Sequence, residues 1–253
     1  MNHVLITGAS AGIGEAFARQ LAEQGEHLIL VARRRDRLDA IADDVRRAHG
    51  VTVQTLAADL TRADGVNQVI ERIEHEDWGI KGLINNAGFG ERGAFADLDH
   101  GRQMDMVQVN VNTVVDFTHR LIPRLREASD AFILNVASLA SFQAGPQMTS
   151  YYATKAFVLI FSESLHEELK AEGIHVSCLC PGPTQTEFAD KADLAGSLLF
   201  RMGTMTADDV ARIGLARRHK AVVIPGFRNW LLAVLAQMSP RLVVRRLAGL
   251  LHK

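Results

Sequence analysis

The sequence predicts an α/β fold, a doubly wound parallel sheet of about seven strands with helices on both faces. Short, nearly continuous apolar runs alternate along the chain with longer amphipathic segments. Strands that helices cover on both faces are apolar throughout, and the regular alternation implies right-handed crossovers between parallel strands. The 253 residues, 47% hydrophobic and 23% charged, suit a single domain over residues 1–253.

The expected elements follow in chain order. Strands are predicted at 3–7, 27–32, 51–56, 82–86, 131–137, 174–180 and 221–225. Helices are predicted at 13–24, 35–49, 63–77, 102–128, 150–172 and 207–219. Gly25 and Gly173 stand where helices should stop, and Thr206 with Asp209 resembles a capping box.

The C-terminal third departs from this alternation. Residues 183–205 form an irregular stretch, the expected substrate loop, and 226–253 predict a basic amphipathic extension of two helices broken near Pro240. No acidic residue follows Asp209, whereas residues 210–253 hold nine basic ones. Such an extension can pack on its own loop, on a neighbouring subunit, or peripherally on a membrane. The net charge of the whole chain is only −1, so no nucleic-acid partner is expected.

Cys178 and Cys180 are the only cysteines, too few for a disulfide framework. Their spacing in an apolar run predicts two buried thiols on one strand face. Because no second cluster of cysteine or histidine accompanies them, no metal site is expected. The chain opens on a strand and has no apolar run of the ~18 residues that span a membrane, so a cytoplasmic location is expected.

The first strand runs into TGASAGIG, residues 7–14, and then into a helix. Glycines there let the backbone turn tightly and approach a phosphate, which the free N–H groups and partial positive charge of the helix start would attract. The spacing GxxxGxG differs from the common GxGxxG fingerprint, and a plain glycine-rich turn is the alternative. The loop predicts a Rossmann-like dinucleotide site that includes Gly8, Ser10, Gly12, Ile13 and Gly14.

The second strand ends in VARRRDRL and indicates which nucleotide is bound. An NAD site needs an acidic residue at this strand end for the ribose 2′-hydroxyl, but the first carboxylate is Asp36. Arg33 or Arg34 can instead pair with a 2′-phosphate. We therefore predict NADP (NADPH) rather than NAD as the cofactor. A solvated charged turn that opens a helix would also explain these arginines.

The only two tyrosines stand together in TSYYATKAF, residues 149–157. Tyr151 and Lys155 are four apart and share a helix face, and Tyr152 is three before the same lysine. A buried lysine cation would lower the phenol pKa from about 10 towards neutral pH, where the phenol can exchange a proton with a carbonyl or alcohol oxygen. Ser138, at the end of an apolar strand, could hydrogen-bond the same oxygen.

These motifs, with NNAG at 85–88, occur in the order and spacing of the short-chain dehydrogenase/reductase family, which the chain resembles over about residues 3–225. The resemblance implies that Tyr151 is the general acid and base, that Lys155 holds the nicotinamide ribose and lowers the tyrosine pKa, and that Ser138 orients the carbonyl. The helix asparagine that positions a water in the proton relay matches Asn110, with Asn112 the weaker candidate. Asn110 could also merely satisfy backbone groups.

The resemblance also implies the cofactor contacts. Asp59, with Leu60 beside it, would read the adenine amino group, although Asp59 could simply cap the next helix. Basic residues inside the glycine loop are common among NADP-preferring members, and Ala11 departs from that pattern. The remaining implied contacts, at the adenosine ribose, the nicotinamide carboxamide and the pyrophosphate, are Asn86, Ala87, Gly88, Pro181, Gly182, Thr184 and Thr186.

The expected activity is hydride transfer between NADP(H) and the carbonyl or secondary alcohol of a small apolar substrate, whether acyl, aromatic or steroid-like. Its apolar lining would come from Phe89, Phe142, Met148, Phe188, Leu194, Leu198, Leu199, Phe200, Met202 and Met205. Alternatives on the same fold are a non-catalytic cofactor-binding regulator and a protein that associates with a lipid surface. The family resemblance implies a homodimer or homotetramer formed through the helices at 102–128 and 150–172.

Overall fold

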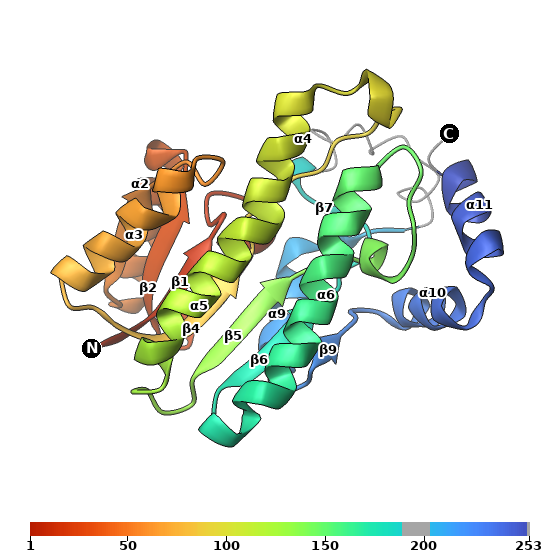
Figure 1. The fold of residues 1–253 in the computed structure, drawn as a ribbon. Coiled ribbons are helices and arrows are strands. Elements are labelled where there is room, and N and C mark those ends of the chain that lie inside the picture. Colours follow the sequence, from red (N-terminus) through yellow and green to blue (C-terminus); the bar gives the residue numbers. More distant parts are fainter. Residues whose placement is uncertain (189–202, 252–253) are drawn as a thin grey trace.

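The computed structural model describes residues 1–188 and 203–251, and it confirms a parallel sheet of seven strands. The strand order is β3-β2-β1-β4-β5-β6-β9, so the chain reverses its direction of winding between β1 and β4 (Figure 1). The strands are β1 Asn2–Thr7, β2 His27–Ala32, β3 Val53–Ala57, β4 Gly79–Asn85, β5 Phe132–Val136, β6 His175–Leu179 and β9 Val222–Val223. A reversal of this kind opens a crevice at the carboxyl ends of the strands, where open α/β sheets bind ligands.

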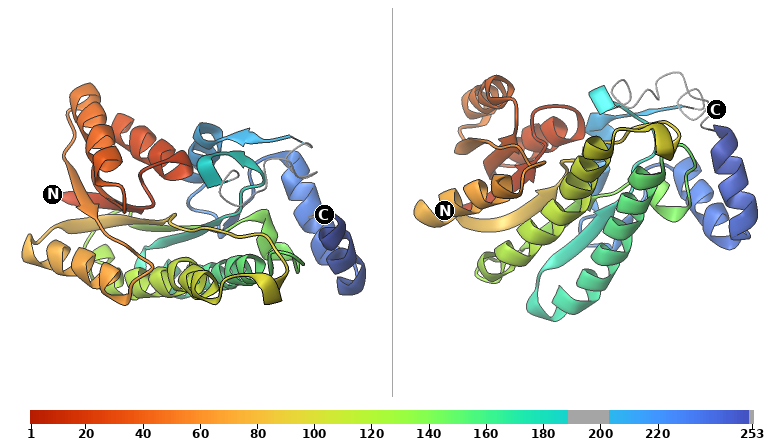
Figure 2. Two further views of the ribbon diagram at one scale, coloured as in Figure 1. Left: turned by 90° about the horizontal axis from the view of Figure 1, so that it is seen from above. Right: turned by 45° about the horizontal axis from the view of Figure 1, so that its top comes forward.

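Helices cover both faces of the sheet, as Figure 2 shows in its left view. One face carries α1 (Gly12–Glu23), α2 (Arg35–His49) and α9 (Ala207–Ala216), which share a buried apolar core with the strands. The opposite face carries α3 (Ala63–His75), α5 (Thr113–Leu125) and α6 (Thr149–Leu169), over a second core. Strands that are apolar on both faces are stable only when helices cover both faces, so the apolar strands of this sequence lead to the doubly wound architecture.

The helix expected at 102–128 contains a feature that the periodicity did not predict. It starts as α4 (His100–Val107), widens into a π-helical turn over Gln108–Asn112, and continues as α5. Single π turns inside α-helices insert an extra residue and occur often at functional sites. Asn110 lies within this turn and is almost completely buried.

Several predicted boundaries were wrong by a few residues. β3 begins at Val53, β4 begins already at Gly79, and β9 has only two residues. A 3₁₀ turn at Lys170–Glu172 ends the long helix α6, and two short strands, β7 (Thr184–Gln185) and β8 (Met205–Thr206), pair at the base of the predicted substrate loop.

The predicted helix ends are confirmed. Gly25 and Gly173 adopt left-handed φ values of 81° and 76°, which glycine tolerates best. The Thr206 hydroxyl accepts a hydrogen bond of 3.1 Å from the Asp209 N–H, and so caps α9.

The extension forms two helices, α10 (Phe227–Met238) and α11 (Arg241–Leu251), separated at Pro240 as predicted. They lie at one end of the molecule, beyond β9 (Figure 1). α10 contacts the 3₁₀ turn Leu139–Phe142, which follows β5, and α11 comes close to Pro146. Within the described residues, no helix has both the length and the apolar character needed to cross a membrane.

Candidate active site

The glycine loop lies at the carboxyl end of β1, beside the point where the winding reverses. Gly8 and Gly12 have left-handed φ values of 67° and 56°. A Cβ atom on Gly14 would come within 2.3 Å of the Gly8 carbonyl oxygen, so only glycine fits there. Ala11, which starts α1, makes no side-chain cap, so the first N–H groups of the helix have no side-chain partner at that position. This backbone cradle fits a phosphate group.

The NNAG segment after β4 is tied to this loop through Thr7, to which sequence reasoning gave no role. The Thr7 hydroxyl accepts from the N–H groups of Asn86 and Ala87, at 3.0 Å each. The Asn86 amide donates to the carbonyl oxygens of Thr7 and Gly8, at 2.9 and 3.2 Å. These bonds fix the glycine loop against the neighbouring strand end, so Asn86 supports the cradle with its side chain.

Gly88, the last residue of the NNAG segment, lies close to both Asn110 and Lys155. A Cβ atom there would stand 3.0 Å from Asn110 Oδ1 and 3.3 Å from Lys155 Nζ. The Asn110 side chain is engaged with protein groups, since its Nδ2 also donates to Thr154 Oγ1 at 3.1 Å. Asn112, the weaker candidate, is bonded to Gln108 on the outside of the turn. The structure therefore places Asn110, and not Asn112, near Lys155.

Ser138, Tyr151 and Lys155 converge at the carboxyl end of β5. Ser138 follows the strand, and its hydroxyl accepts from the Ala140 N–H at 3.1 Å. A hydrogen bond from Ser138 favours the charged form of the Tyr151 phenol, but burial outweighs it and raises the phenol pKa to about 12. The Ser138–Tyr151 contact brings together the two hydroxyls that sequence analysis assigned to one substrate oxygen.

The expected lowering of the tyrosine pKa by Lys155 is not found. The Lys155 ammonium donates to the Val136 carbonyl oxygen at 2.8 Å and lies 6.0 Å from the centre of the Tyr151 ring. Burial lowers the pKa of Lys155 from 10.5 to about 8. Loss of hydration therefore sets the direction of both pKa shifts. Tyr151 and Lys155 are too far apart for their mutual attraction to offset it.

Tyr152 occupies a different position from its neighbour. A Cβ on Gly145 would fall within 2.3 Å of the Tyr152 ring, so this ring packs directly on the Gly145 backbone. Burial raises the pKa of Tyr152 as well, and the nearby Tyr151 adds to that rise. Tyr151 is thus the tyrosine that reaches Ser138, which is the tyrosine that the family resemblance indicated.

The two arginines after β2 have different surroundings. Arg33 is exposed and forms no ion pair among the described residues. Arg34 donates from Nη2 to the Ser10 carbonyl and hydroxyl oxygens, at 3.3 and 3.2 Å, which holds its guanidinium on the glycine loop. Its Nη1 pairs with Glu187, a residue that sequence analysis did not consider.

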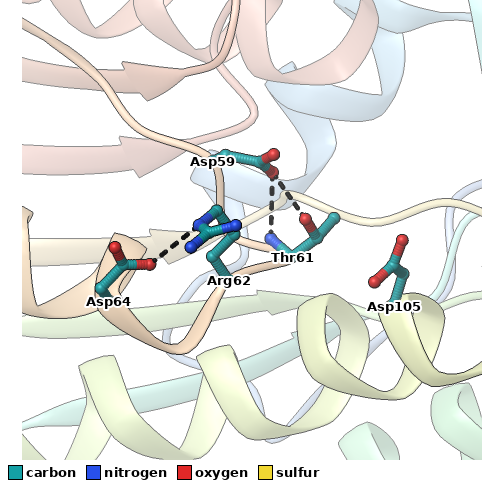
Figure 3. A pocket seen from close by; sticks show the side chains of 5 residues that line it. All are labelled: Asp59, Thr61, Arg62, Asp64 and Asp105. Carbon is teal, nitrogen blue, oxygen red and sulfur yellow. Dashed lines mark hydrogen bonds and ion pairs between the residues drawn. The ribbon is translucent and has the colours of Figure 1, made fainter. Parts of the chain in front are cut away.

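Asp59 ends the loop after β3 and is engaged locally. Its carboxylate accepts from the backbone N–H and the hydroxyl of Thr61, at 3.1 and 2.9 Å. It does not cap α3, whose first residue follows Arg62 without a side-chain cap. Asp59 lines an open depression of about 570 Å³. The other residues that line it, drawn in Figure 3, are Thr61, Arg62, Asp64 and Asp105. The neighbouring Leu60 is buried in the core of the α3 face.

The segment after β6 closes the other side of the crevice. The Pro181 carbonyl accepts from the Leu139 N–H at 2.9 Å, and a Cβ on Gly182 would meet the Asn229 side chain of α10 at 2.5 Å. Thr184 bonds back to the Gly182 carbonyl at 2.9 Å. Thr186 lies on the glycine loop, since its methyl group would be 2.9 Å from a Cβ on Gly12. Ile13, one residue further on, packs against the core of the α1 face.

Apolar side chains surround Tyr151. Phe188 lies with its ring centre 5.5 Å from that of Tyr151, and Met148 and Phe89 belong to the same cluster. Phe142 packs instead with residues around β6, and Met205 packs against the core of the α1 face. The other predicted lining residues, Leu194, Leu198, Leu199, Phe200 and Met202, lie outside the described residues.

Cys178 and Cys180 are buried free thiols with their sulfurs 3.7 Å apart, as the strand spacing predicted. Among residues 1–188 and 203–251, no three side chains of the metal-ligating types gather as a metal site.

Two features of this doubly wound sheet are typical of oxidoreductases that bind a nicotinamide cofactor. One is the glycine loop beside the point where the winding reverses, and the other is the Ser–Tyr–Lys group at the end of β5. The comparisons agree with this class. Residues 2–195 match the family model described as short chain dehydrogenase, and the chain belongs to the short-chain dehydrogenase/reductase family.

Individual relatives differ in what they act on. The very-long-chain 3-oxoacyl-CoA reductase of Anas platyrhynchos is 30% identical, over 91% of this chain and 75% of its own length. Sulfoacetaldehyde reductase 2 of Chromohalobacter salexigens is 35% identical, over 83% and 85%. A short-chain dehydrogenase from Sphingobium yanoikuyae, solved in complex with NADPH, is 35% identical, with a TM-score of 0.81 over 90% of this chain and 88% of that one.

Proposed function

We propose that this protein is an NADPH-dependent reductase of an apolar ketone or aldehyde. The observation that carries the proposal is the convergence of Ser138, Tyr151 and Lys155 beside the glycine loop. Residues of the loop, with Asn86, Ala87 and Gly88, would hold the dinucleotide, and Lys155 its nicotinamide ribose. The cofactor, when bound, supplies the hydride, and the chain supplies placement and the proton.

The proton would come from Tyr151. With its pKa raised to about 12, the phenol keeps its proton at neutral pH and is a donor. The chain can therefore supply the proton that the carbonyl oxygen gains on reduction. Ser138 would hydrogen-bond the same oxygen and so orient the carbonyl towards the phenol.

NADP is proposed over NAD because the end of β2 offers Arg33 and Arg34 and no carboxylate until Asp36. The NADPH-bound relative with 35% identity supports the same choice. An apolar substrate is proposed because Phe188, Met148 and Phe89 surround Tyr151. The 3-oxoacyl-CoA reductase agrees with such a substrate, whereas the sulfoacetaldehyde reductase acts on a small charged one.

The test is NADPH consumption with three carbonyl compounds: a long-chain 3-oxoacyl thioester, a bulky aromatic ketone and sulfoacetaldehyde. We expect turnover of at least one of the first two and little of the third. Turnover of sulfoacetaldehyde alone would exclude the apolar substrate. NADPH binding without turnover of any carbonyl would favour a cofactor-binding regulator.

We also propose a homodimer or homotetramer formed through α5 and α6. On these helices Val115 and Phe157 are exposed, and Ile160, three residues after Phe157 on α6, is 65% exposed. Val114 is buried in the core of its own subunit. Light scattering at micromolar concentration tests the assembly, and Ile160→Arg should shift it to monomers because it would place like charges across a two-fold contact.

A peripheral contact of α10 and α11 with an anionic membrane is proposed as a second property of the chain. These helices carry nine of the fifteen large apolar side chains that the described residues expose, including Phe227, Leu235 and Met238. A second copy would present the same basic surface, with no carboxylate after Asp209 to pair with it. An anionic lipid surface complements both the charge and the apolar character.

A further inference from the structure

Arg34 joins two segments that are far apart in the sequence. Its guanidinium is held on the glycine loop by Ser10, through Nε and Nη2. The other end of the same group faces Glu187, with 3.1 Å between Nη1 and Oε2 and 3.2 Å between Nη1 and Oε1. Glu187 follows β7, on the opposite side of the crevice. Of the two arginines that could pair with the cofactor 2′-phosphate, Arg34 is the one held on the glycine loop, and a carboxylate thus occupies it.

The residues on either side of Glu187 also contact residues of the candidate site. Thr186 packs on Gly12 of the phosphate cradle, and Phe188 lies against Tyr151. Three consecutive residues therefore contact the glycine loop, Arg34 and the proposed proton donor Tyr151. The position of Glu187 is fixed on both sides along the chain, so its pairing with Arg34 is built into the way this segment crosses the crevice.

We propose that Glu187 competes with the 2′-phosphate for Arg34 and thereby sets how strongly the protein prefers NADPH to NADH; this rests on the proposed NADP cofactor. A phosphate monoester carries about −1.5 to −2 charges and three acceptor oxygens, against one charge on the carboxylate. The phosphate therefore wins the guanidinium, but with a smaller gain than it would have at an unpaired arginine. NADH carries no such group and leaves the Arg34–Glu187 pair intact.

The solvent exposure of the Arg34–Glu187 ion pair limits how much Glu187 can change the binding constant of the cofactor. The Arg34 and Glu187 side chains are 40% and 43% exposed, so water screens their attraction. Exposed ion pairs of this kind contribute about 0–1 kcal/mol, which corresponds to at most about fivefold in a binding constant. Glu187 therefore tunes the preference for the phosphorylated cofactor and does not abolish it.

The experiment measures equilibrium binding of NADP⁺, NAD⁺ and adenosine 2′,5′-bisphosphate to the whole protein by calorimetry. The bisphosphate carries the 2′-phosphate without the nicotinamide, so its binding is independent of catalysis. Glu187→Gln should bind NADP⁺ and the bisphosphate about two- to fivefold more tightly, with NAD⁺ unchanged. Glu172→Gln is the matched control, because it breaks an ion pair with Arg126 at the far end of α6 and should change none of the three.

The Arg34→Ala background separates competition from simple repulsion. There, Glu187→Gln should give no further gain, because the contested guanidinium is gone. Two outcomes would overturn this inference and leave the proposed cofactor standing. One is that Glu187→Gln still tightens NADP⁺ binding when Arg34 is absent, and the other is that Glu187→Gln binds NADP⁺ no more tightly than wild type. A wild-type protein that binds NAD⁺ as tightly as NADP⁺ would overturn the proposed cofactor as well.

Discussion

Asn110 holds the backbone of Phe89 with both ends of its amide. Its Oδ1 accepts from the Phe89 N–H at 3.1 Å, and its Nδ2 donates to the Phe89 carbonyl oxygen at 3.0 Å. Phe89 continues the chain directly after Gly88, so this pair fixes the wall of the crevice beside Lys155. The π-helical turn places a buried asparagine opposite this backbone.

Asn110→Ala should destabilise the protein by roughly 1–3 kcal/mol, because it leaves the two backbone groups of Phe89 without their side-chain partner. Asn110→Asp should also destabilise it, since an ionised carboxylate accepts from the N–H but repels the carbonyl oxygen. Urea unfolding measures both effects. Asn112→Ala, on the outside of the same turn, is the control and should change stability by less than about 0.5 kcal/mol. Equal effects of the two alanine variants would contradict the assignment.

Tyr151→Phe should lower turnover by about 10²–10⁴-fold while cofactor binding is kept, because only the proton donor is lost. Tyr152→Phe removes the neighbouring hydroxyl and should have a mild effect, since the Tyr152 ring packs on Gly145 and its hydroxyl is hydrogen-bonded to Gln143. Steady-state kinetics with NADPH, together with a binding titration for each variant, distinguishes the two. A reversed order of the variants would show that the roles of the two tyrosines are exchanged.

Stability should rise with pH between about 8 and 9 in the cofactor-free protein, because of Lys155. Burial lowers its folded-state pKa from 10.5 to about 8, so in this window the unfolded chain binds more protons than the folded one. Raising the pH then favours folding, by up to about 1.4 kcal/mol per pH unit. Urea unfolding from pH 8 to 9 should show this slope in wild type and lose it in Lys155→Met.

Lys170→Met is the matched control, because it removes an exposed lysine from the other end of the same helix and should keep the slope. The range stops at pH 9 because the hydrogen bond with Cys178 and burial raise the pKa of the Cys180 thiol well above its ordinary value of 9.0, so at higher pH the folded protein keeps a thiol proton that the unfolded chain loses. Burial raises the Tyr151 pKa from 10 to about 12, so above pH 10 the folded protein retains a proton that the unfolded chain loses, and stability then falls.

The exposed face of α10 and α11 should bind vesicles that contain anionic lipid and should leave neutral vesicles unbound. Flotation at low and high salt measures this, and binding should weaken with salt by up to about 1 kcal/mol per engaged arginine. Leu231→Gln with Leu235→Gln should reduce binding, because both side chains are exposed on α10. Phe95→Gln removes an exposed aromatic group outside these helices and should have no effect. Protein that stays unbound under all conditions would leave the two helices as an element that packs on protein.

The sequence alone determined the order of strands and helices, and with it the fold. Continuous apolar runs such as 27–32 admit only strands covered on both faces, and the helix-stopping glycines Gly25 and Gly173 mark their own positions because left-handed backbone favours glycine. The motif resemblance to the short-chain dehydrogenase/reductase family also indicated Tyr151 rather than Tyr152. These features are local, so a pattern over a few residues is enough to reveal them.

Tertiary structure decided what depends on contacts between distant segments. The π-helical turn around Asn110 is set by hydrogen bonds to Phe89 and Thr154 and has no periodic signal of its own. The pKa values of Tyr151 and Lys155 are governed by burial, which overrides the effect expected from their spacing. The pairing of Arg34 with Glu187 joins residues 153 positions apart. No short sequence pattern predicts the contact between Arg34 and Glu187, because it depends on how the chain crosses the carboxyl ends of the strands.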